Sequence, residues 1–304
     1  MLTRCARIVA SLAVTTVAFV SASSAADLYA PNWYAHGVNR YDIDSGALLR
    51  TYSDPAIDGA QSSVVGTDGR LHVVGNLSRN LVSFDLDTGA TVGDMPFDYP
   101  FNYVRDTEVG PDGDLYITRA ESNTDRGYVY RYDGQSGDLI GRFTMELQQT
   151  SGIAFGPDGD LFATDHCDDV VYRYDGQTGA RIGVFASSQM HQPEGLAFGP
   201  DGNLYVADAG AEAILRFDGT TGDFIDAVDT GSQLQHVWDI AFDPDGLLYA
   251  SVTSTSSILR YDPADDSYLG VFAHPVLAHY IDIVPEPSTL LLSLGGLLFL
   301  LRRR

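Results

Sequence analysis

The sequence contains no lysine, and its 18 basic residues are all arginines. Between residues 27 and 285 there are 13 arginines against 40 aspartates and glutamates, which gives this part a formal charge of 13 minus 40, or −27. A surface of this sign repels the phosphates of nucleic acids and of anionic lipids. The composition therefore argues against nucleic acid as a partner, and it fits solubility in a salty or cation-rich exterior.

Cysteine is also scarce. Cys5 lies in an N-terminal segment that we expect to be removed, which leaves Cys167 alone. An exported protein without a disulfide must be stabilised by its core, and about 260 residues are enough to bury one. A helical pattern is missing as well, because no window shows a convincing 3.6-residue apolar period. We expect almost no helix outside the two ends of the chain.

The N-terminus has the pattern of a secretory signal peptide. Arg4 and Arg7 precede an apolar run over residues 8–20, and small residues follow up to Ala26. We predict a signal peptide over residues 1–26, with cleavage before Asp27. A transmembrane anchor is the alternative, but about 13 apolar residues fall short of the roughly 20 that span a bilayer.

The C-terminus combines a short polar motif, an apolar run and a basic end. Pro285, Glu286 and Pro287 are followed by an apolar stretch over residues 289–301 and by three arginines. This order resembles the PEP-CTERM sorting signal of Gram-negative bacteria, so we assign residues 285–304 to such a signal. The resemblance implies transient attachment to the inner membrane, with the arginines inside, and cleavage by an exosortase-type protease. The mature protein would then reach the periplasm, the cell surface or the extracellular matrix; a plain membrane anchor is the alternative.

Two short motifs repeat along the whole region between these ends. An Asp-Gly turn recurs five times, with spacings between its aspartates of 44, 46, 43 and 44 residues. An aromatic-Asp motif occurs six times, starting at Tyr41, and in the first five copies a glycine follows the aspartate by four residues. Short segments rich in Val, Ile, Tyr and Phe separate the motifs and read as strands, and Asp-Gly favours tight turns. Four short strands per unit of 40 to 50 residues predict an all-β fold, a six-bladed β-propeller of four-stranded antiparallel blades over residues 27–284.

The first blade begins with its second strand, at residues 28–32, so its inner strand is missing from the N-terminus. A propeller avoids an open edge when one end of the chain completes the blade that the other end begins. The segment over residues 279–284 aligns with the inner strands of the other blades. We therefore predict that this C-terminal strand closes the ring.

The repeats resemble the NHL-repeat and gluconolactonase-like (regucalcin-type) propellers, most clearly in "PEGLAFGPDGNLYVAD" from Pro193 to Asp208. In that family a glutamate at the start of an inner strand binds a metal together with an asparagine and an aspartate of other blades. Glu194 matches such a position, and Asp165 and Asp208 end second strands. The resemblance thus implies a possible site for Ca²⁺, Mg²⁺ or Zn²⁺ on these three residues, although no full set of ligands can be carried over.

Histidines concentrate on one side of the expected ring. Six of the seven fall in or beside loops of the face where the inner strands begin, here called the top face; His72 falls within a strand. Histidine suits proton transfer and metal binding, so His191 and His279 are candidate bases. The inner strands also bring polar and aromatic residues to the channel, and these, with two loop histidines, are candidates for binding: Arg105, Asp106, Trp238, Asp239, Tyr280, His166 and His236.

Two functions follow from these observations. The first is an exported binding module whose top face recognises a glycan or a matrix protein, because PEP-CTERM proteins as a class are associated with exopolysaccharide. The second is a metal-dependent lactonase or lyase with its site at the top of the channel around Glu194. Against both stands the plain alternative that the channel of a propeller is polar and filled with water.

Overall fold

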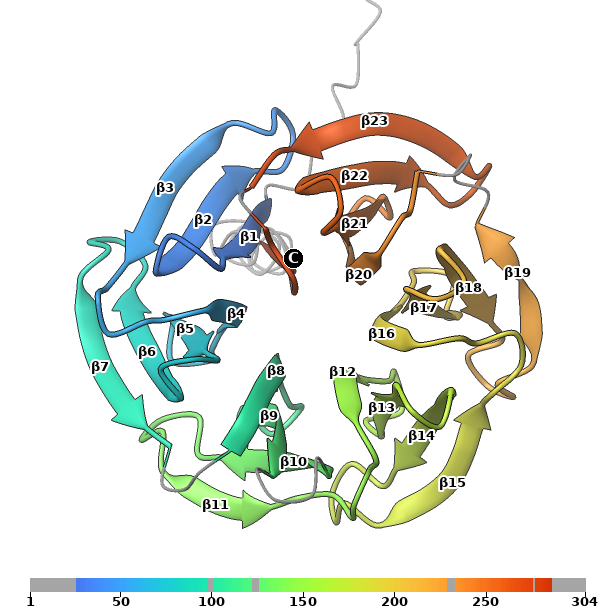
Figure 1. Ribbon diagram of the computed structural model, residues 1–304, viewed down its shortest axis with the longest axis horizontal. Helices are drawn as coiled ribbons and strands as arrows, with labels where there is room; N and C mark the ends of the chain where they lie inside the picture. Colours follow the sequence, from blue (N-terminus) through green and yellow to red (C-terminus); the bar gives the residue numbers. More distant parts are fainter. Residues whose placement is uncertain (1–25, 98–100, 122–125, 229–232, 276, 286–304) are drawn as a thin grey trace, which may run out of the picture.

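The computed structural model describes residues 26–97, 101–121, 126–228, 233–275 and 277–285. The chain forms six four-stranded antiparallel sheets arranged as blades around a central axis (Figure 1). The predicted six-bladed propeller is therefore confirmed. The described residues include no helix that is long and apolar enough to cross a membrane. The predicted signal peptide, apart from Ala26, and the predicted sorting residues Glu286 and Pro287 lie outside the described residues.

From its inner to its outer strand, the first blade contains β24 (Asp282–Pro285), β1 (Ala26–Asn32), β2 (Gly37–Asp42) and β3 (Leu48–Ser53). The second contains β4 (Ala60–Val65), β5 (Arg70–Gly75), β6 (Asn80–Asp85) and β7 (Thr91–Pro96). The third contains β8 (Phe101–Val109), β9 (Leu115–Glu121), β10 (Gly127–Tyr132) and β11 (Leu139–Arg142).

The remaining blades follow the same pattern. The fourth contains β12 (Thr150–Phe155), β13 (Leu161–Asp165), β14 (Val170–Tyr174) and β15 (Arg181–Ala186). The fifth contains β16 (Pro193–Phe198), β17 (Leu204–Asp208), β18 (Ala213–Phe217) and β19 (Phe224–Val228). The sixth contains β20 (Val237–Phe242), β21 (Leu248–Val252), β22 (Ser257–Asp262) and β23 (Ser267–Ala273).

The two ends of the propeller meet in the first blade, as predicted. β24 pairs antiparallel with β1, and Asp27 lies opposite Val284. The ladder starts at Asp282 rather than at residue 279, because the backbone N–H of Tyr280 donates to the carbonyl of Gln61 in the second blade, at 3.3 Å. At its other end the ladder continues to a pair between Ala26 and Pro285, one residue beyond each expected boundary.

The repeated aspartates act in turns on the bottom face, where the inner strands end. Asp133 Oδ1 accepts the backbone N–H groups of Gln135 and Ser136, at 2.9 and 2.7 Å. Gly137 then closes the turn with a φ of 78°, a left-handed conformation that glycine adopts without steric cost. Because the motif combines a side-chain acceptor with a glycine, its recurrence marks the hairpins of the blades.

Aromatic pairs join neighbouring blades near the bottom of the ring. Tyr116 of the third blade contacts Phe155 of the fourth edge to face, with ring centroids 4.9 Å apart. Phe162 and Phe198 repeat this contact between the fourth and fifth blades at 4.9 Å. Such pairs add roughly 0.5 to 1.5 kcal/mol beyond the apolar area that they bury. The repeat of the contact explains why the sequence places an aromatic residue at the end of several inner strands.

Hydroxyl groups join the blades near the top of the ring. Thr164 Oγ1 accepts the backbone N–H of Gly152 in its own blade at 2.8 Å and donates to the carbonyl of Glu194 in the next blade at 2.6 Å. Ser251 makes the equivalent bonds to Asp239 N and to the carbonyl of His279. These bonds fix the height at which each inner strand enters the channel, and so they position the side chains at its mouth.

Candidate functional site

The mouth of the channel is formed by the first residues of the inner strands, and an ion pair crosses it. Arg105 Nη1 lies 3.1 Å from Glu194 Oε2 and 2.9 Å from Ser151 Oγ, so one guanidinium links the third, fourth and fifth blades. Glu194 is only 2% exposed. A buried carboxylate needs a partner to offset the loss of hydration, and Arg105 provides it.

A histidine approaches the same carboxylate from the other side. His166, which directly follows β13, places Nδ1 2.9 Å from Glu194 Oε1. Both oxygens of Glu194 therefore face a nitrogen, one from a guanidinium and one from an imidazole. Arg105 orients the carboxylate through its hydrogen bond, whereas His166 lies close to the carboxylate without a hydrogen bond of its own.

Aromatic rings form the opposite wall of the mouth. The His279 ring lies between Trp33 and Trp238, with centroid distances of 5.2 and 4.7 Å. The Arg105 guanidinium carbon lies 5.9 Å from the centroid of the Trp238 ring. Burial, followed by the positive charge of Arg105, lowers the pKa of His279 to about 4. His279 is thus a neutral ring at neutral pH and a weak base.

These walls enclose a pocket of about 350 Å³ on the top face. Polar atoms without a protein partner surround it or lie just below it: Trp238 Nε1, His279 Nδ1 and the hydroxyl of Tyr280, which is 1% exposed. Buried polar atoms are nearly always hydrogen-bonded, so these atoms indicate a place for a ligand or for water. The pocket is lined by Trp33, Gln61, Asn76, Tyr103, Arg105, Trp238, Leu277 and His279.

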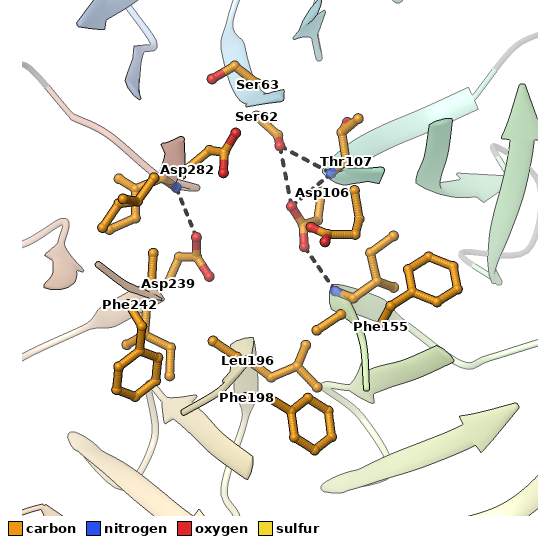
Figure 2. A pocket seen from close by; sticks show the side chains of 18 residues that line it. Ser62, Ser63, Asp106, Thr107, Phe155, Leu196, Phe198, Asp239, Phe242 and Asp282 are labelled. Atoms are coloured by element: carbon orange, nitrogen blue, oxygen red, sulfur yellow. Dashed lines mark hydrogen bonds between the residues drawn. The ribbon is translucent and has the colours of Figure 1, made fainter. Parts of the chain in front are cut away.

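Two of the predicted binding residues lie one level lower, where they join blades. Asp106 Oδ2 accepts the backbone N–H of Ile153 in the fourth blade, and Asp239 Oδ2 accepts that of Ile281, each at 2.9 Å. Figure 2 shows the two carboxylates facing the channel from opposite sides. Burial raises the pKa of Asp106 to about 7 and also raises the pKa of Asp239, with each further raised by a neighbouring negative charge.

A comparison with protein families matches residues 51–242 to the SMP-30/gluconolactonase/LRE-like region. The chain belongs to this family. The assignment agrees with the gluconolactonase-like resemblance of the repeats. Among curated proteins, no relative of this SMP-30/gluconolactonase/LRE-like chain was found.

Solved structures share the fold of this SMP-30/gluconolactonase/LRE-like propeller at low identity. A protein of unknown function from Bacteroides caccae has a TM-score of 0.68 and 13% identity, over 86% of this chain and 100% of that one. A chain of the nidogen/laminin complex has a TM-score of 0.68 and 18% identity, over 85% and 98%. A catalytically inactive virginiamycin B lyase from Staphylococcus aureus with quinupristin has a TM-score of 0.60 and 16% identity, over 82% and 85%.

The resemblance to this family implied a metal on Glu194, Asp165 and Asp208. The two aspartates are fully buried, and their oxygens accept backbone N–H groups: Asp165 Oδ2 from Gln148 at 2.7 Å, and Asp208 Oδ2 from His191 at 2.6 Å. Within the described ranges, no three His, Cys, Asp or Glu residues form a group that could hold a metal ion. As arranged, these residues do not fit a divalent cation, and we derive no step through one.

The predicted top-face histidines take different roles. Element order places all six on the top face, but only His166 and His279 contribute their rings to the mouth. His191 binds Asp208 through its backbone N–H, and the backbone carbonyl of His236 accepts a hydrogen bond from Thr253 at 3.2 Å. The spacing of the histidines in the sequence does not distinguish those whose rings reach the mouth from the other top-face histidines.

Several pocket residues were missed by the sequence analysis, Trp33 and Asn76 among them. Trp33 and Asn76 each directly follow the last residue of the second strand of a blade, at the ends of β1 and β5. Asn76 Oδ1 accepts the backbone N–H of Val104 at 3.1 Å, so it also ties the second blade to the third. Both residues directly follow a second strand, and this position at the top face can be recognised in the sequence.

Proposed function

We propose that this SMP-30/gluconolactonase/LRE-like propeller is an exported binding module, acting at the cell surface or in the extracellular matrix, that recognises an uncharged saccharide at the mouth of its channel. The observation that supports this function is the pocket in which Trp33, His279 and Trp238 meet polar atoms without protein partners. Aromatic faces pack against the C–H faces of sugar rings, and neighbouring donors and acceptors bind the hydroxyls.

The charges at the mouth favour an uncharged ligand. Arg105, the cation in the pocket wall, is paired with Glu194 at 3.1 Å, and the pair carries little net charge. The Glu194 carboxylate lies beside the pocket and would repel a second anion. A volume of about 350 Å³ is at the small end of the range for ligand sites, which suits one end of a glycan chain.

Calorimetric titration of the full-length chain with neutral mono- and oligosaccharides tests this proposal. Trp238→Ala should weaken binding at least tenfold, because it removes a wall of the pocket. Tyr34→Ala is the matched control, since Tyr34 is 68% exposed and lies outside the pocket lining. The proposal is overturned if no neutral saccharide binds, or if both variants bind as well as the wild type.

The second candidate function is a metal-dependent lactonase or lyase, although Glu194, Asp165 and Asp208 as arranged do not form its metal site. Family membership supports it, and so does the fold shared with virginiamycin B lyase. In the structure, the observation in its favour is a buried carboxylate, Glu194, fixed beside an imidazole at the mouth of the channel. Turnover of lactones in the presence of Ca²⁺, Mg²⁺ or Zn²⁺ that is lost in Glu194→Gln would replace the binding function with this one.

Export and sorting complete the proposal. The signal peptide, the PEP-CTERM-like tail and an exosortase-type protease would bring the propeller to the outside, with the tail leaving from the bottom face. Because Val284 pairs with Asp27, the first residue of the predicted mature chain, cleavage should occur after Val284. Mass spectrometry of the mature C-terminus checks this, and a mature chain that ends before Val284 would contradict it.

A further inference from the structure

The lower part of the channel holds an uncompensated group of acids. Four carboxylates line a cavity of about 270 Å³ below the mouth: Asp106, Glu108, Asp239 and Asp282. Among the residues that the structure describes, no arginine or histidine forms an ion pair with any of them. Burial of negative charge without a positive partner is unfavourable, so this cavity favours positively charged ligands.

The carboxylates are arranged at two heights. Asp106 and Glu108 are two residues apart on β8, which corresponds to roughly 6 to 7 Å along a strand. On the other side, Asp239 Oδ2 binds Ile281 N, and Asp282 follows one residue further down β24. The cavity is thus faced by two pairs of carboxylates. The upper pair is Asp106 and Asp239, and the lower pair is Glu108 and Asp282.

Apolar side chains lie between the two heights. Ile153, Leu196, Ile240 and Ile281 belong to the lining of the cavity and occupy the positions that follow the upper level on their strands. A ligand that fits both layers has a positive charge at each end and an apolar segment between them. The span of two strand residues is about that of a four-carbon chain with an amine at each end.

A single metal ion does not suit this arrangement. In Figure 2, Asp106 lies on one side of the channel, and Asp239 and Asp282 lie on the other. Consistent with this, the described part of the chain has no group of three acids, histidines or cysteines that could hold one ion. The negative charges are spread along and across the cavity, as a ligand with separated charges requires.

Hydroxyl groups provide an independent indication of a ligand. Ser63 and Thr107 line the same cavity and are each 4% exposed, yet their oxygens have no hydrogen-bond partner. Hydroxyl oxygens accept hydrogen bonds from ammonium groups, so Ser63 and Thr107 add two acceptors to the carboxylates of this cavity.

We propose that the lower channel binds a linear aliphatic diamine of the 1,4-diaminobutane class, with one ammonium group at the level of Asp106 and Asp239 and the other at the level of Glu108 and Asp282. This site is separate from the mouth pocket, and it does not depend on the saccharide-binding function. The methylene groups of the diamine would pack against the apolar layer, and the ammonium groups would neutralise the carboxylates.

Isothermal titration of the full-length chain at pH 8 tests the site with 1,4-diaminobutane as the probe. We expect one molecule bound per chain, and at least tenfold weaker binding of 1-butylamine, which has one charge, and of 1,2-diaminoethane, which is too short. Asp106→Asn combined with Asp239→Asn should weaken binding at least tenfold. The matched control, Asp87→Asn with Asp138→Asn, removes the same charge from exposed turns and should leave binding unchanged.

Three results would overturn the proposal. They are the absence of diamine binding to the wild type, equal binding of 1-butylamine and 1,4-diaminobutane, and binding of Ca²⁺ or Mg²⁺ at the same residues in preference to the diamine. An equal loss of affinity in the two double variants would assign the effect to the general surface charge and would also overturn it. If the Asp106 and Asp239 variant does not fold, the comparison of the three amines on the wild type still tests the proposal. Only a site with two carboxylate levels at this spacing prefers the four-carbon diamine.

Discussion

Thr164 Oγ1 of the fourth blade donates a 2.6 Å hydrogen bond to the backbone carbonyl of Glu194 in the fifth blade. The residue that anchors the mouth of the channel is therefore held from two directions. Its backbone is fixed by a hydroxyl of the preceding blade, and its side chain is fixed by Arg105 of the third. Residues in three blades thus cooperate to place one carboxylate.

Thr164→Val keeps the shape of this side chain but removes the hydroxyl. The carbonyl of Glu194 and the backbone N–H of Gly152 then lose a buried partner, which should destabilise the fold by about 1 to 3 kcal/mol. Urea unfolding measures this change. Thr164→Ser retains the hydroxyl and should lie close to the wild type; equal destabilisation by both substitutions would assign the effect to packing.

Arg105→Ala leaves Glu194 buried without its cation. We expect a loss of about 3 to 5 kcal/mol in the free energy of unfolding, because an unpaired buried charge is more costly than the absence of the pair. The double variant Arg105→Ala with Glu194→Ala should be more stable than Arg105→Ala alone. A double-mutant cycle measured by thermal unfolding checks this, and strictly additive effects would contradict the proposed pairing.

Removal of the closing strand should unfold the domain. A chain that ends after Ala278 lacks β24, the acceptor carbonyl of His279 and the N–H of Ile281 that binds Asp239. A chain that ends after Pro285 keeps all of these groups and should remain folded. Circular dichroism and thermal unfolding of the two truncations compare them directly; equal melting temperatures would refute the closure.

The acids of the channel should make the protein less stable at mildly alkaline pH. Burial raises the pKa of Asp106 from 3.8 to about 7, so the folded state binds more protons than the unfolded state up to that pH. The free energy of unfolding then falls as the pH rises. Between pH 6.5 and 8 we expect a decrease on the order of 1 kcal/mol from Asp106 alone.

Histidine acts in the opposite direction at the lower end of this window. Burial lowers the pKa of His279 to about 4 and also lowers the pKa of His72, so near pH 6.5 the unfolded state binds protons at these rings that the folded state does not. This contribution is the same in the wild type and in Asp106→Asn, so the comparison of the two isolates Asp106. Urea unfolding at pH 6.5 and at pH 8 measures the difference, and Asp106→Asn should reduce it. Asp87→Asn, on an exposed turn, should not; a decrease that persists in full in Asp106→Asn would show that other groups cause it.

The sequence predicted the blades because their determinants are local. Most of the hairpins have an aspartate and a glycine at fixed spacing, as at Asp133 and Gly137, and such pairs repeat visibly along the chain. The closure was predictable as well, since one strand was missing at one end and one was left over at the other. Its starting residue was not, because the contact of Tyr280 with Gln61 joins two blades.

The site was predictable only in part. The alignment of inner strands brought Arg105, Glu194, Trp238 and His279 to the mouth, and the structure places them there. The ion pair between Arg105 and Glu194 was not foreseen, because it joins residues 89 positions apart across a channel whose width depends on packing. The same dependence explains why Asp165 and Asp208, although suited to a metal by type, bind backbone amides of their own blades.

The pairing of β24 with β1 also determines when the molecule can finish folding. Ala26 and Pro285 lie opposite each other, so the first blade stays incomplete until nearly the whole propeller has been synthesised. Until then β1 presents an unpaired edge, which is open to pairing with other chains. The ring therefore closes only when β24 has been synthesised. A chain whose synthesis stops before that point would expose the unpaired edge of β1 at its N-terminal end.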